Sequence, residues 1–329
     1  MATLRIVLVG LGEIGQAIGR AVLGLGATIV GAVDPAPDKM GRDLGELLGQ
    51  PAGAVKVQPA IENVAANARG ALAILATRSN LKDTFGQIKA LSELGMSVLS
   101  TCEELSFPYA SEPELAAEVD RLARQHGVAV LGTGINPGFL MDTLPLTLSA
   151  MCQEVRQISV RRVIDAARRR GSFQRKVGVG LSLPEFEKQI QGAQISGHVG
   201  LEQSIRLVAS ALGWHLDSVV AEAPTPVVSG DSIGGLRQQA TGIRGGRPVI
   251  QLVFEAYAGA EDLDSIEIDG VPPIHTTIRP GVHGDLGTVA VVVNCIPRLL
   301  QSPPGLHTMA DFALACYSPR LSDPRSPTS

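Results

Sequence analysis

The fold is decided near the start of the chain, by the stretch Arg5-Ile-Val-Leu-Val-Gly10-Leu-Gly12-Glu-Ile-Gly15-Gln-Ala-Ile-Gly-Arg20. A run of β-branched and aliphatic residues leads into three glycines with the spacing G-x-G-x-x-G, and a helix-compatible segment follows. Gly10 allows a tight turn, Gly12 lets a ligand approach the backbone where no Cβ stands, and Gly15 lets the helix pack closely on the strand. This order predicts a strand, a phosphate-binding turn and a helix.

The residues around these glycines favour a bound dinucleotide. A second apolar run ends at Asp34, roughly 20 residues after Gly15, where a carboxylate can accept hydrogen bonds from the adenosine ribose. The phosphates would lie at the positive end of the helix that begins with Glu13 and Ile14. We therefore expect a nicotinamide or flavin dinucleotide at this turn.

The segment after Asp34 leaves the choice of nicotinamide cofactor open. Lys39 and Arg42 stand where a 2′-phosphate on the ribose could be bound, whereas Asp34 favours the unphosphorylated ribose. Because the two signals point to different cofactors, we expect the protein to use NAD or NADP.

Length and composition restrict the function classes. With 329 residues the chain is long enough for two domains, and a hydrophobic content of 45% allows each to have a core. The formal net charge of −4 gives no electrostatic basis for binding nucleic acid or an anionic membrane. We interpret the only dense basic runs, Arg161-Arg162 and Arg168-Arg169-Arg170, as solvent-exposed loops or subunit contacts.

Several signals are missing from the sequence. The four cysteines are far apart and no residues have metal-ligand spacing, which argues against a structural metal or a disulfide framework. No stretch offers the roughly 18 consecutive apolar residues of a membrane span. The first strand begins too close to the N-terminus to leave room for a signal peptide. We expect a cytoplasmic protein without a metal.

Strand-like and helix-like segments alternate up to residue 137. This alternation predicts an α/β domain with a Rossmann-like, doubly wound parallel sheet over residues 1–137. Ligands of such sheets bind beyond the carboxyl ends of the strands. Two apolar runs, 71–77 and 96–101, end in polar loops, and Asn80 is placed to cap the helix expected after the first. The residues of these loops that we expect to contact the cofactor are Thr77, Arg78, Ser79 and Thr101.

The pattern changes after residue 137. Helices are expected at 140–152, 186–191 and 201–212 and strands at 155–164, 218–221, 249–257 and 264–269, while 287–294 suits a strand or a buried helix. We expect an α+β substrate and dimerisation domain over 138–295, a segment at about 296–317 that packs back on the first domain, and a disordered tail at 318–329. The helix at 201–212 and the apolar strands could form the interface of a homodimer.

Glu103 and Glu104 are the first candidates for chemistry, since they follow a strand at the end of the sheet where the nicotinamide is expected. Hydride transfer requires a proton to move on the neighbouring heteroatom, and a carboxylate in a dry cleft can do this near neutral pH. Adjacent side chains of an extended segment point in opposite directions. We therefore expect one functional glutamate and one salt-bridge or capping partner, with two exposed loop glutamates as the alternative.

Three further polar residues lie between glycines or beside them. Asn136, in Gly134-Ile-Asn-Pro-Gly138, belongs to a strong turn signal and can also offer an amide to substrate or cofactor. His198 and His283 are each flanked by glycines, so they can line a cleft, although a lone histidine is often a cap or a surface residue. We retain all three as candidate ligand contacts.

Five separated stretches resemble the 2,4-diaminopentanoate dehydrogenase family. Its relatives include native NAD(P)-dependent amine dehydrogenases, and the family is similar to dihydrodipicolinate reductase in fold. The resemblance extends from residue 4 to about 300 and rests on Asp34-Pro-Ala-Pro-Asp-Lys-Met-Gly-Arg-Asp-Leu-Gly-Glu-Leu-Leu-Gly49, Ser100-Thr-Cys-Glu-Glu-Leu-Ser-Phe-Pro108, Gly132-Thr-Gly-Ile-Asn-Pro-Gly-Phe-Leu-Met-Asp142, Gly197-His-Val-Gly-Leu-Glu202 and Gly284-Asp-Leu-Gly-Thr288.

The resemblance implies reversible conversion of a primary amine, water and NAD(P)+ into a carbonyl compound, ammonium and NAD(P)H. It implies a glutamate as the acid and base, and we favour Glu103 while keeping Glu104 open. The His-His pair and the Lys-x-Asp-x-Pro-Ser-Gly-Thr-Ala run of dihydrodipicolinate reductases do not occur here, which argues against that activity. Few aromatic residues are available, so we expect a pocket of aliphatic side chains with Phe139 and Phe173, suited to a small aliphatic substrate.

Two other functions are compatible with the sequence. A reductase of a carbonyl group or an unsaturated ring would work without ammonia. A non-catalytic sensor would bind NADPH without turnover, and replacing Glu103 and Glu104 with glutamine would leave it unaffected. The loop of two glutamates and the full second domain favour the enzyme.

Overall fold

The computed structural model describes residues 3–192, 194–195 and 197–312, which form two compact units. Of the described residues, unit 1 comprises 3–138 and 284–312, and unit 2 comprises those between 139 and 283. The expected first boundary at 137 lies one residue from the observed division. The return to unit 1 begins at Gly284 and not at about 296, because residues 287–294 belong to a helix of unit 1.

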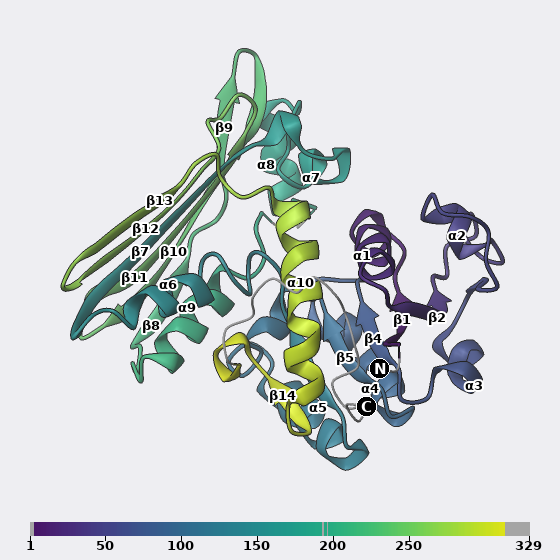
Figure 1. Cartoon of the computed structure of the whole chain (residues 1–329). Coiled ribbons are helices and arrows are strands. Elements are labelled where there is room, and N and C mark those ends of the chain that lie inside the picture. The colour runs from purple at the N-terminus through teal and green to yellow at the C-terminus, as the bar shows by residue number, and fades with distance from the viewer. Residues whose placement is uncertain (1–2, 193, 196, 313–329) are drawn as a thin grey trace. The chain divides into compact units, whose positions relative to one another are not determined.

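Unit 1 is built on a parallel sheet of seven strands (Figure 1). The strand order β14-β6-β5-β4-β1-β2-β3 contains the order 3-2-1-4-5-6 of a dinucleotide-binding sheet, which confirms the expected α/β fold. The sequence expectation did not include the added edge strand. The strands are β1 (Arg5–Val9), β2 (Thr28–Val33), β3 (Val57–Gln58), β4 (Leu72–Leu75), β5 (Ser97–Ser100), β6 (Ala129–Gly132) and β14 (Gly305–His307).

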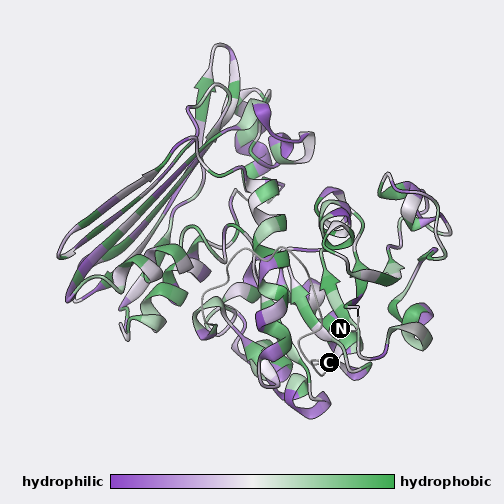
Figure 2. Cartoon of the chain, in the orientation of Figure 1, coloured by the Kyte–Doolittle hydropathy of each residue, from purple (hydrophilic) through white to green (hydrophobic). Residues whose placement is uncertain are grey.

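Helices cover both faces of this sheet. Helices α1 and α10 pack against each other, as do α4 and α5, and α10 also contacts β5 and β6. The central strands are almost wholly buried, and Figure 2 shows them in the green of apolar residues. The helices are α1 (Glu13–Gly24), α2 (Leu44–Leu47), α3 (Ala65–Ala68), α4 (Leu81–Glu93), α5 (Pro113–His126) and α10 (Gly284–Gln301), with the 3-10 turns η1 (Ile61–Val64), η2 (Glu104–Ser106) and η4 (Met309–Asp311).

Unit 2 contains a mixed sheet in the order β13-β12-β7-β11-β10-β8, with β9 paired to β10. Only β7 and β11 run parallel, and the other neighbours are antiparallel. Alternate residues of the long strands are buried, as expected for a sheet with one covered face. The strands are β7 (Glu154–Asp165), β8 (Ser218–Ala221), β9 (Thr225–Ser229), β10 (Ser232–Arg244), β11 (Arg247–Tyr257), β12 (Leu263–Val271) and β13 (Ile274–Ile278).

The helices of unit 2 lie on one face of its sheet, and no described helix covers the other (Figure 1). Leu201, Ile205 and Val208 of α9 are buried in the core between helix and sheet. These side chains are therefore used in the core of unit 2, and the dimer contact expected of the helix and the strands stays a prediction. The helices are α6 (Thr143–Ser149), α7 (Gly171–Lys176), α8 (Leu183–Gln191) and α9 (Leu201–Ala211), with the 3-10 turn η3 (Ala166–Arg168).

Some elements differ from the sequence expectation. The helix expected at 140–152 is shorter, because Asp142 caps it by accepting a hydrogen bond from Thr143 N. Strand β10 was not expected, since its central stretch Gly-Gly-Leu-Arg-Gln-Gln mixes glycines with long polar residues that have low strand propensity. The tail expected to be disordered, 318–329, lies outside the described residues.

Candidate functional site

The turn between β1 and α1 has the geometry that a dinucleotide requires. Gly10 adopts a φ of +88°, and a Cβ there would clash with the carbonyl of Ala76. A Cβ on Gly15 would clash with the carbonyl oxygen of Gly10, so glycine lets the helix start this close to the strand. At Gly12 no described atom lies near the place of a Cβ, and this residue begins α1 without a side-chain cap. The first turn of α1 thus suits a pyrophosphate.

Asp34 is anchored beside this turn, at the carboxyl end of β2, and is 7% exposed. Its carboxylate accepts hydrogen bonds from Lys39 Nζ and Leu11 N, both at 2.8 Å, and from Ala36 N at 3.0 Å. Burial raises the pKa of Asp34, but the hydrogen bonds from Lys39 and from backbone N–H groups outweigh it and hold the pKa below 3.8. The carboxylate is therefore charged and paired with Lys39, while Arg42 is exposed nearby in the chain.

The loops after β4 and β5 are joined at the carboxyl end of the sheet. Ser79 O accepts hydrogen bonds from Glu104 N at 3.0 Å and from Cys102 Sγ at 3.1 Å. Parallel neighbours end at the same edge, so the two loops meet there. The fold thereby gathers the residues expected to contact the cofactor, Thr77, Arg78, Ser79 and Thr101, of which Arg78 is exposed and the others half-buried.

The two glutamates have different surroundings. Glu104 Oε2 accepts a hydrogen bond of 2.7 Å from the backbone N of Leu81, the first residue of α4. Asn80 occupies the N-cap position of α4, but its side chain makes no capping hydrogen bond, so the expected cap by Asn80 is wrong. A carboxylate at this helix end is also favoured by the helix dipole. The structure therefore assigns the capping role to Glu104, and Glu103 is half-buried just before η2.

The backbone of the acidic loop is held against β6. Gly132 lies under this loop, and a Cβ there would stand only 2.5 Å from the carbonyl carbon of Leu105. Ser106 Oγ donates a hydrogen bond of 2.8 Å to Glu103 O. A glycine on the neighbouring strand thus allows the close packing that positions Glu103.

The turn signal around Asn136 is confirmed. The Asn136–Pro137 peptide is cis and Gly138 has a φ of +125°, with the place of its Cβ 2.6 Å from Thr133 Oγ1. Asn136 is half-buried and lies in unit 1, whereas Phe139, also half-buried, begins unit 2. Their contact with a ligand stays a prediction.

His198 is half-buried in unit 2, in the loop before α9. Its ring stacks on Phe254 of β11 with centroids 4.6 Å apart, and its backbone N donates to Gln238 Oε1 at 2.8 Å. Burial and the positive charges of Lys176 and Arg162 lower the pKa of His198 well below 6.5. The imidazole is therefore neutral at pH 7. Many protein atoms pack around the ring, but part of the residue remains exposed to solvent.

The other two expected substrate contacts differ in exposure. Phe173 is half-buried in α7, and the guanidinium carbon of Arg169 lies 4.5 Å from its ring centroid. His283 is exposed and is the last residue of unit 2. Neither contact with substrate is tested by this geometry.

The interpretation of the basic runs as exposed is wrong for two arginines. Arg162 is 1% exposed and Arg169 is 8% exposed. Side chains alternate along β7, so Arg161 faces outward while Arg162 turns to the face that the helices cover. A short basic run does not reveal this, because the direction of each side chain depends on the strand and on what packs against it.

Arg162 lies in a row of four residues that runs across the sheet and that the sequence analysis did not identify. We call it the polar row, because all of its members except Phe254 are polar. The strand registers align Asp264, Arg162, Phe254 and Gln238 across four neighbouring strands. Arg162 Nη2 donates to Val282 O at 2.6 Å, and its Nη1 lies 3.4 Å from Asp264 Oδ1. Asp264 Oδ2 accepts a hydrogen bond of 2.7 Å from Val282 N. Only the register of the sheet brings these residues together, so no local sequence motif reveals that they are neighbours.

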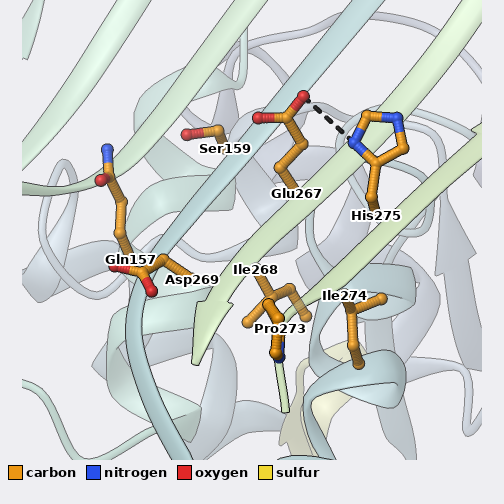
Figure 3. Close-up of a pocket in the computed structure, with 8 residues that line it drawn as sticks. All are labelled: Gln157, Ser159, Glu267, Ile268, Asp269, Pro273, Ile274 and His275. Carbon is orange, nitrogen blue, oxygen red and sulfur yellow. Dashed lines mark ion pairs between the residues drawn. The ribbon is translucent and has the colours of Figure 1, made fainter. Parts of the chain in front are cut away.

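A pocket on unit 2 contains none of the expected site residues (Figure 3). Glu267 and His275 form an ion pair across it, with Oε1 and Nδ1 3.3 Å apart, and both side chains are exposed. The pocket is lined by Gln157, Ser159, Glu267, Ile268, Asp269, Pro273, Ile274 and His275. Glu267, Asp269 and His275 are exposed, and Gln157 and Ser159 are half-buried.

Neither a metal centre nor a membrane helix is found in the part of the chain that the structure describes. Over residues 3–192, 194–195 and 197–312, no three or more histidine, cysteine, aspartate or glutamate side chains are grouped so as to hold a metal ion. Over the same residues, no helix has both the length and the apolar character needed to cross a bilayer.

Known proteins share both units of this chain. Residues 139–318 match the model of the 2,4-diaminopentanoate dehydrogenase C-terminal domain. The 2,4-diaminopentanoate dehydrogenase of Acetoanaerobium sticklandii is 33% identical over 332 residues, covering 95% of this chain and 94% of the relative. An amine dehydrogenase of Streptomyces virginiae is 25% identical over 369 residues, covering 96% and 98%.

A solved structure has the same fold. The amine dehydrogenase from Mycobacterium smegmatis gives a TM-score of 0.87 at 23% identity, covering 97% of this chain and 99% of that one. At this identity the likeness shows a shared fold, and the agreement extends over the whole length of both chains.

Proposed function

Because this chain belongs to the 2,4-diaminopentanoate dehydrogenase family, it is an oxidoreductase that acts on CH–NH2 groups, and we propose that it reversibly deaminates a small aliphatic amine. In this reaction amine, water and oxidised cofactor give a carbonyl compound, ammonium and reduced cofactor. A nicotinamide cofactor, when bound at the glycine turn, would supply the hydride acceptor for the oxidation and the hydride donor for the reverse reaction. The observation that carries the proposal is the acidic loop after β5, at the ligand-binding edge of a dinucleotide-binding sheet.

We assign proton transfer to Glu103, since the carboxylate of Glu104 caps α4. In the reductive direction the Glu103 carboxylate takes a proton from ammonium, which leaves ammonia with a lone pair to attack the carbonyl carbon. Glu103 then returns that proton to the hydroxyl group of the resulting carbinolamine. The C–O bond breaks, water departs, and an iminium ion remains. General acid–base catalysis of this kind contributes about 100- to 10,000-fold to the rate.

NAD and NADP are both proposed as cofactors. Asp34 can accept a hydrogen bond from the hydroxyls of an unphosphorylated ribose, while its ion pair with Lys39 reduces the repulsion that a 2′-phosphate would meet. The charges beside the ribose site therefore do not exclude either cofactor.

The test is oxidation of NADPH or NADH, followed by absorbance, with small aldehydes and ketones in the presence and absence of ammonium. We expect oxidation that requires ammonium. E103Q should lower kcat/KM by about 100- to 10,000-fold while cofactor binding is unchanged.

E104Q is the matched control, because its amide oxygen can still accept the hydrogen bond from Leu81 N. It should retain most of the activity. If E104Q loses activity and E103Q does not, Glu104 is the catalytic residue. If the cofactor is oxidised without ammonium, the protein is a carbonyl reductase and not an amine dehydrogenase.

A further inference from the structure

The buried ion pair of the polar row makes its shortest hydrogen bonds to one backbone residue. Arg162 Nη2 donates to Val282 O at 2.6 Å, and Asp264 Oδ2 accepts from Val282 N at 2.7 Å. In comparison, Arg162 Nη1 and Asp264 Oδ1 are 3.4 Å apart. The two charged groups are therefore oriented toward the backbone of Val282 more than toward each other.

The stability of the core does not explain why this pair is buried. The neighbouring row on the covered face of the sheet is apolar and includes Ile266, Val160 and Leu252, all of them buried. Apolar residues of similar volume are often as stable as a buried ion pair, or more stable. Hydrogen bonds from charged groups to a backbone are strong and directional. The pair is therefore better explained by the segment that it holds.

That segment is the second connection between the two units. Val282 is followed by His283, the last residue of unit 2, and by Gly284, the first residue of α10 in unit 1. The preceding residue is also fixed, since Gly281 N donates to Asp262 O at 3.1 Å. The chain is thus held on unit 2 up to Val282 and leaves the unit one residue later.

The first connection between the units is fixed in a similar way. Unit 2 begins at Phe139, and Asp142, three residues later, is buried. The carboxylate of Asp142 accepts hydrogen bonds from Ser204 Oγ of α9 at 2.7 Å and from Thr143 N at 2.6 Å. A buried carboxylate of unit 2 therefore anchors the chain close to each of the two connections.

On the unit 1 side the two connections are joined to each other. Ile135, which lies just before the first connection, donates a hydrogen bond of 3.4 Å from its backbone N to Thr288 Oγ1 of α10. Helix α10 also packs on α1 and on β5, the strand that precedes the acidic loop. The chain is therefore least restrained within a few residues of Gly138 and of His283, where it passes from one unit to the other.

Hydride transfer is sensitive to such restraint. We expect unit 1 to hold the cofactor and unit 2 to hold the substrate, so different units would supply the two reacting carbons. Reacting atoms must be held about 3 to 3.5 Å apart, and a misplacement of about 1 Å can lower the rate on the order of 100-fold. Residues that fix the connections can therefore affect the rate without contacting the substrate.

We propose that Arg162 and Asp264 are positioning residues that hold Val282 and so fix the point at which the chain leaves unit 2 for α10. Asp264 holds the N–H group of Val282. Arg162 holds its carbonyl oxygen and compensates the charge of Asp264. For its effect on catalysis, this inference rests on the proposed amine dehydrogenase function.

The first experiment measures hydrogen exchange of the Val282 N–H in the full-length protein, by mass spectrometry of the peptide 279–286. R162M/D264L removes both hydrogen bonds to Val282, and R162M/D264N keeps an amide oxygen that can accept one of them. We expect exchange about 10- to 100-fold faster in R162M/D264L, as loss of a hydrogen bond to a charged group predicts, and an intermediate rate in R162M/D264N. Unchanged exchange in R162M/D264L would overturn the proposal.

The second experiment separates positioning from stability. Because apolar residues can replace a buried ion pair without loss, the urea midpoint of R162M/D264L should be no lower than that of the natural protein. We expect kcat for the ammonium-dependent oxidation of NAD(P)H to fall about 10- to 100-fold, with an unchanged Kd for the cofactor. R162M/D264N should recover part of kcat. An unchanged kcat in R162M/D264L would contradict the positioning role, and if that variant does not fold, R162M/D264N decides in its place.

R156Q/D269N is the matched control, because Arg156 and Asp269 form an exposed ion pair of 2.6 Å between the same two strands, β7 and β12. It should change neither kcat nor the exchange of Val282. Effects as large as those of R162M/D264L would show that any ion pair between these strands suffices, which would overturn the proposal. If no carbonyl compound is turned over with ammonium, the proposed function fails, and the exchange of Val282 still decides whether Arg162 and Asp264 hold this connection.

Discussion

At the scale of single residues, the half-buried His198 has a pKa far from its ordinary value. Its pKa lies well below 6.5 in the folded protein because of burial and nearby cations, whereas in the unfolded chain it titrates near 6.5. Below that pH the unfolded state takes up a proton that the folded state does not. The stability that neutral His198 contributes is therefore fully present above pH 6.5 and is lost as the pH falls toward the folded pKa.

We expect H198Q to remove this part of the pH dependence. The free energy of unfolding of the natural protein should fall more steeply between pH 7 and pH 5 than that of the variant, by at most about 1.4 kcal/mol per pH unit. Urea unfolding at several pH values measures both slopes. Parallel curves for the two proteins would show that His198 is not held neutral.

Replacing Lys39 should weaken the binding of NADPH more than the binding of NADH. Lys39 pairs with Asp34 at 2.8 Å, so K39M would leave the carboxylate uncompensated beside the ribose site. We expect the KM for NADPH to rise about tenfold, as for loss of one charge-assisted contact, while the KM for NADH changes little. R42M serves as the comparison, since Arg42 is exposed. Equal effects of K39M on both cofactors would contradict the assignment.

At the scale of elements, a loop and a helix are joined by one carboxylate. Glu104 caps α4 from a different segment of the chain, while Asn80, at the N-cap itself, contributes no side-chain hydrogen bond. A side chain that caps a helix from a distant segment leaves no signature in the helix's own sequence. The sequence pattern therefore located the helix correctly and its cap incorrectly.

E104A should destabilise the protein by about 1 kcal/mol, as loss of a helix cap does, and E104Q by less because the acceptor oxygen remains. Thermal unfolding of the three proteins measures the difference. Unchanged stability of E104A would mean that the hydrogen bond to Leu81 N makes no net contribution.

The strands of unit 2 show a second limit of local patterns. Strand β10 joins β8, β9 and β11, yet its glycines and polar residues gave no strand signal. Its partners compensate for the weak propensity, because Gly235 packs against the backbone of β11 where a side chain would clash with Ala256 O. Gln238, the member of the polar row on this strand, could not be placed without it.

At the scale of the whole molecule, we expect a homodimer. The unit 2 sheet has helices on one face only, and on the other face Glu255 forms ion pairs with Arg161 and Arg237, at 2.6 and 3.2 Å. Each of these groups has an ion-pair partner within one chain, although the two arginines share a single carboxylate and leave one net positive charge. A second copy of this face would therefore meet paired side chains and not isolated ions.

Sedimentation equilibrium should give twice the mass of the 34.3 kDa chain. V253R, which introduces an unpaired charge beside Arg161 on the same face, should give monomers with an unchanged circular dichroism spectrum. A monomeric natural protein would refute the dimer, and a dimeric V253R would exclude this face as its interface.

By itself, the sequence determined the parallel sheet, its glycine turn, most of the elements, the acidic loop and the family. These features depend on conformational demands and periodicities that operate over a few residues. Only the tertiary structure decided that Glu104 caps α4, that Arg162 and Arg169 are buried, and that residues 284–301 return to unit 1 as a helix. Each of these depends on strand register or on packing between segments distant in the chain, and so on free energies that no local stretch of sequence contains.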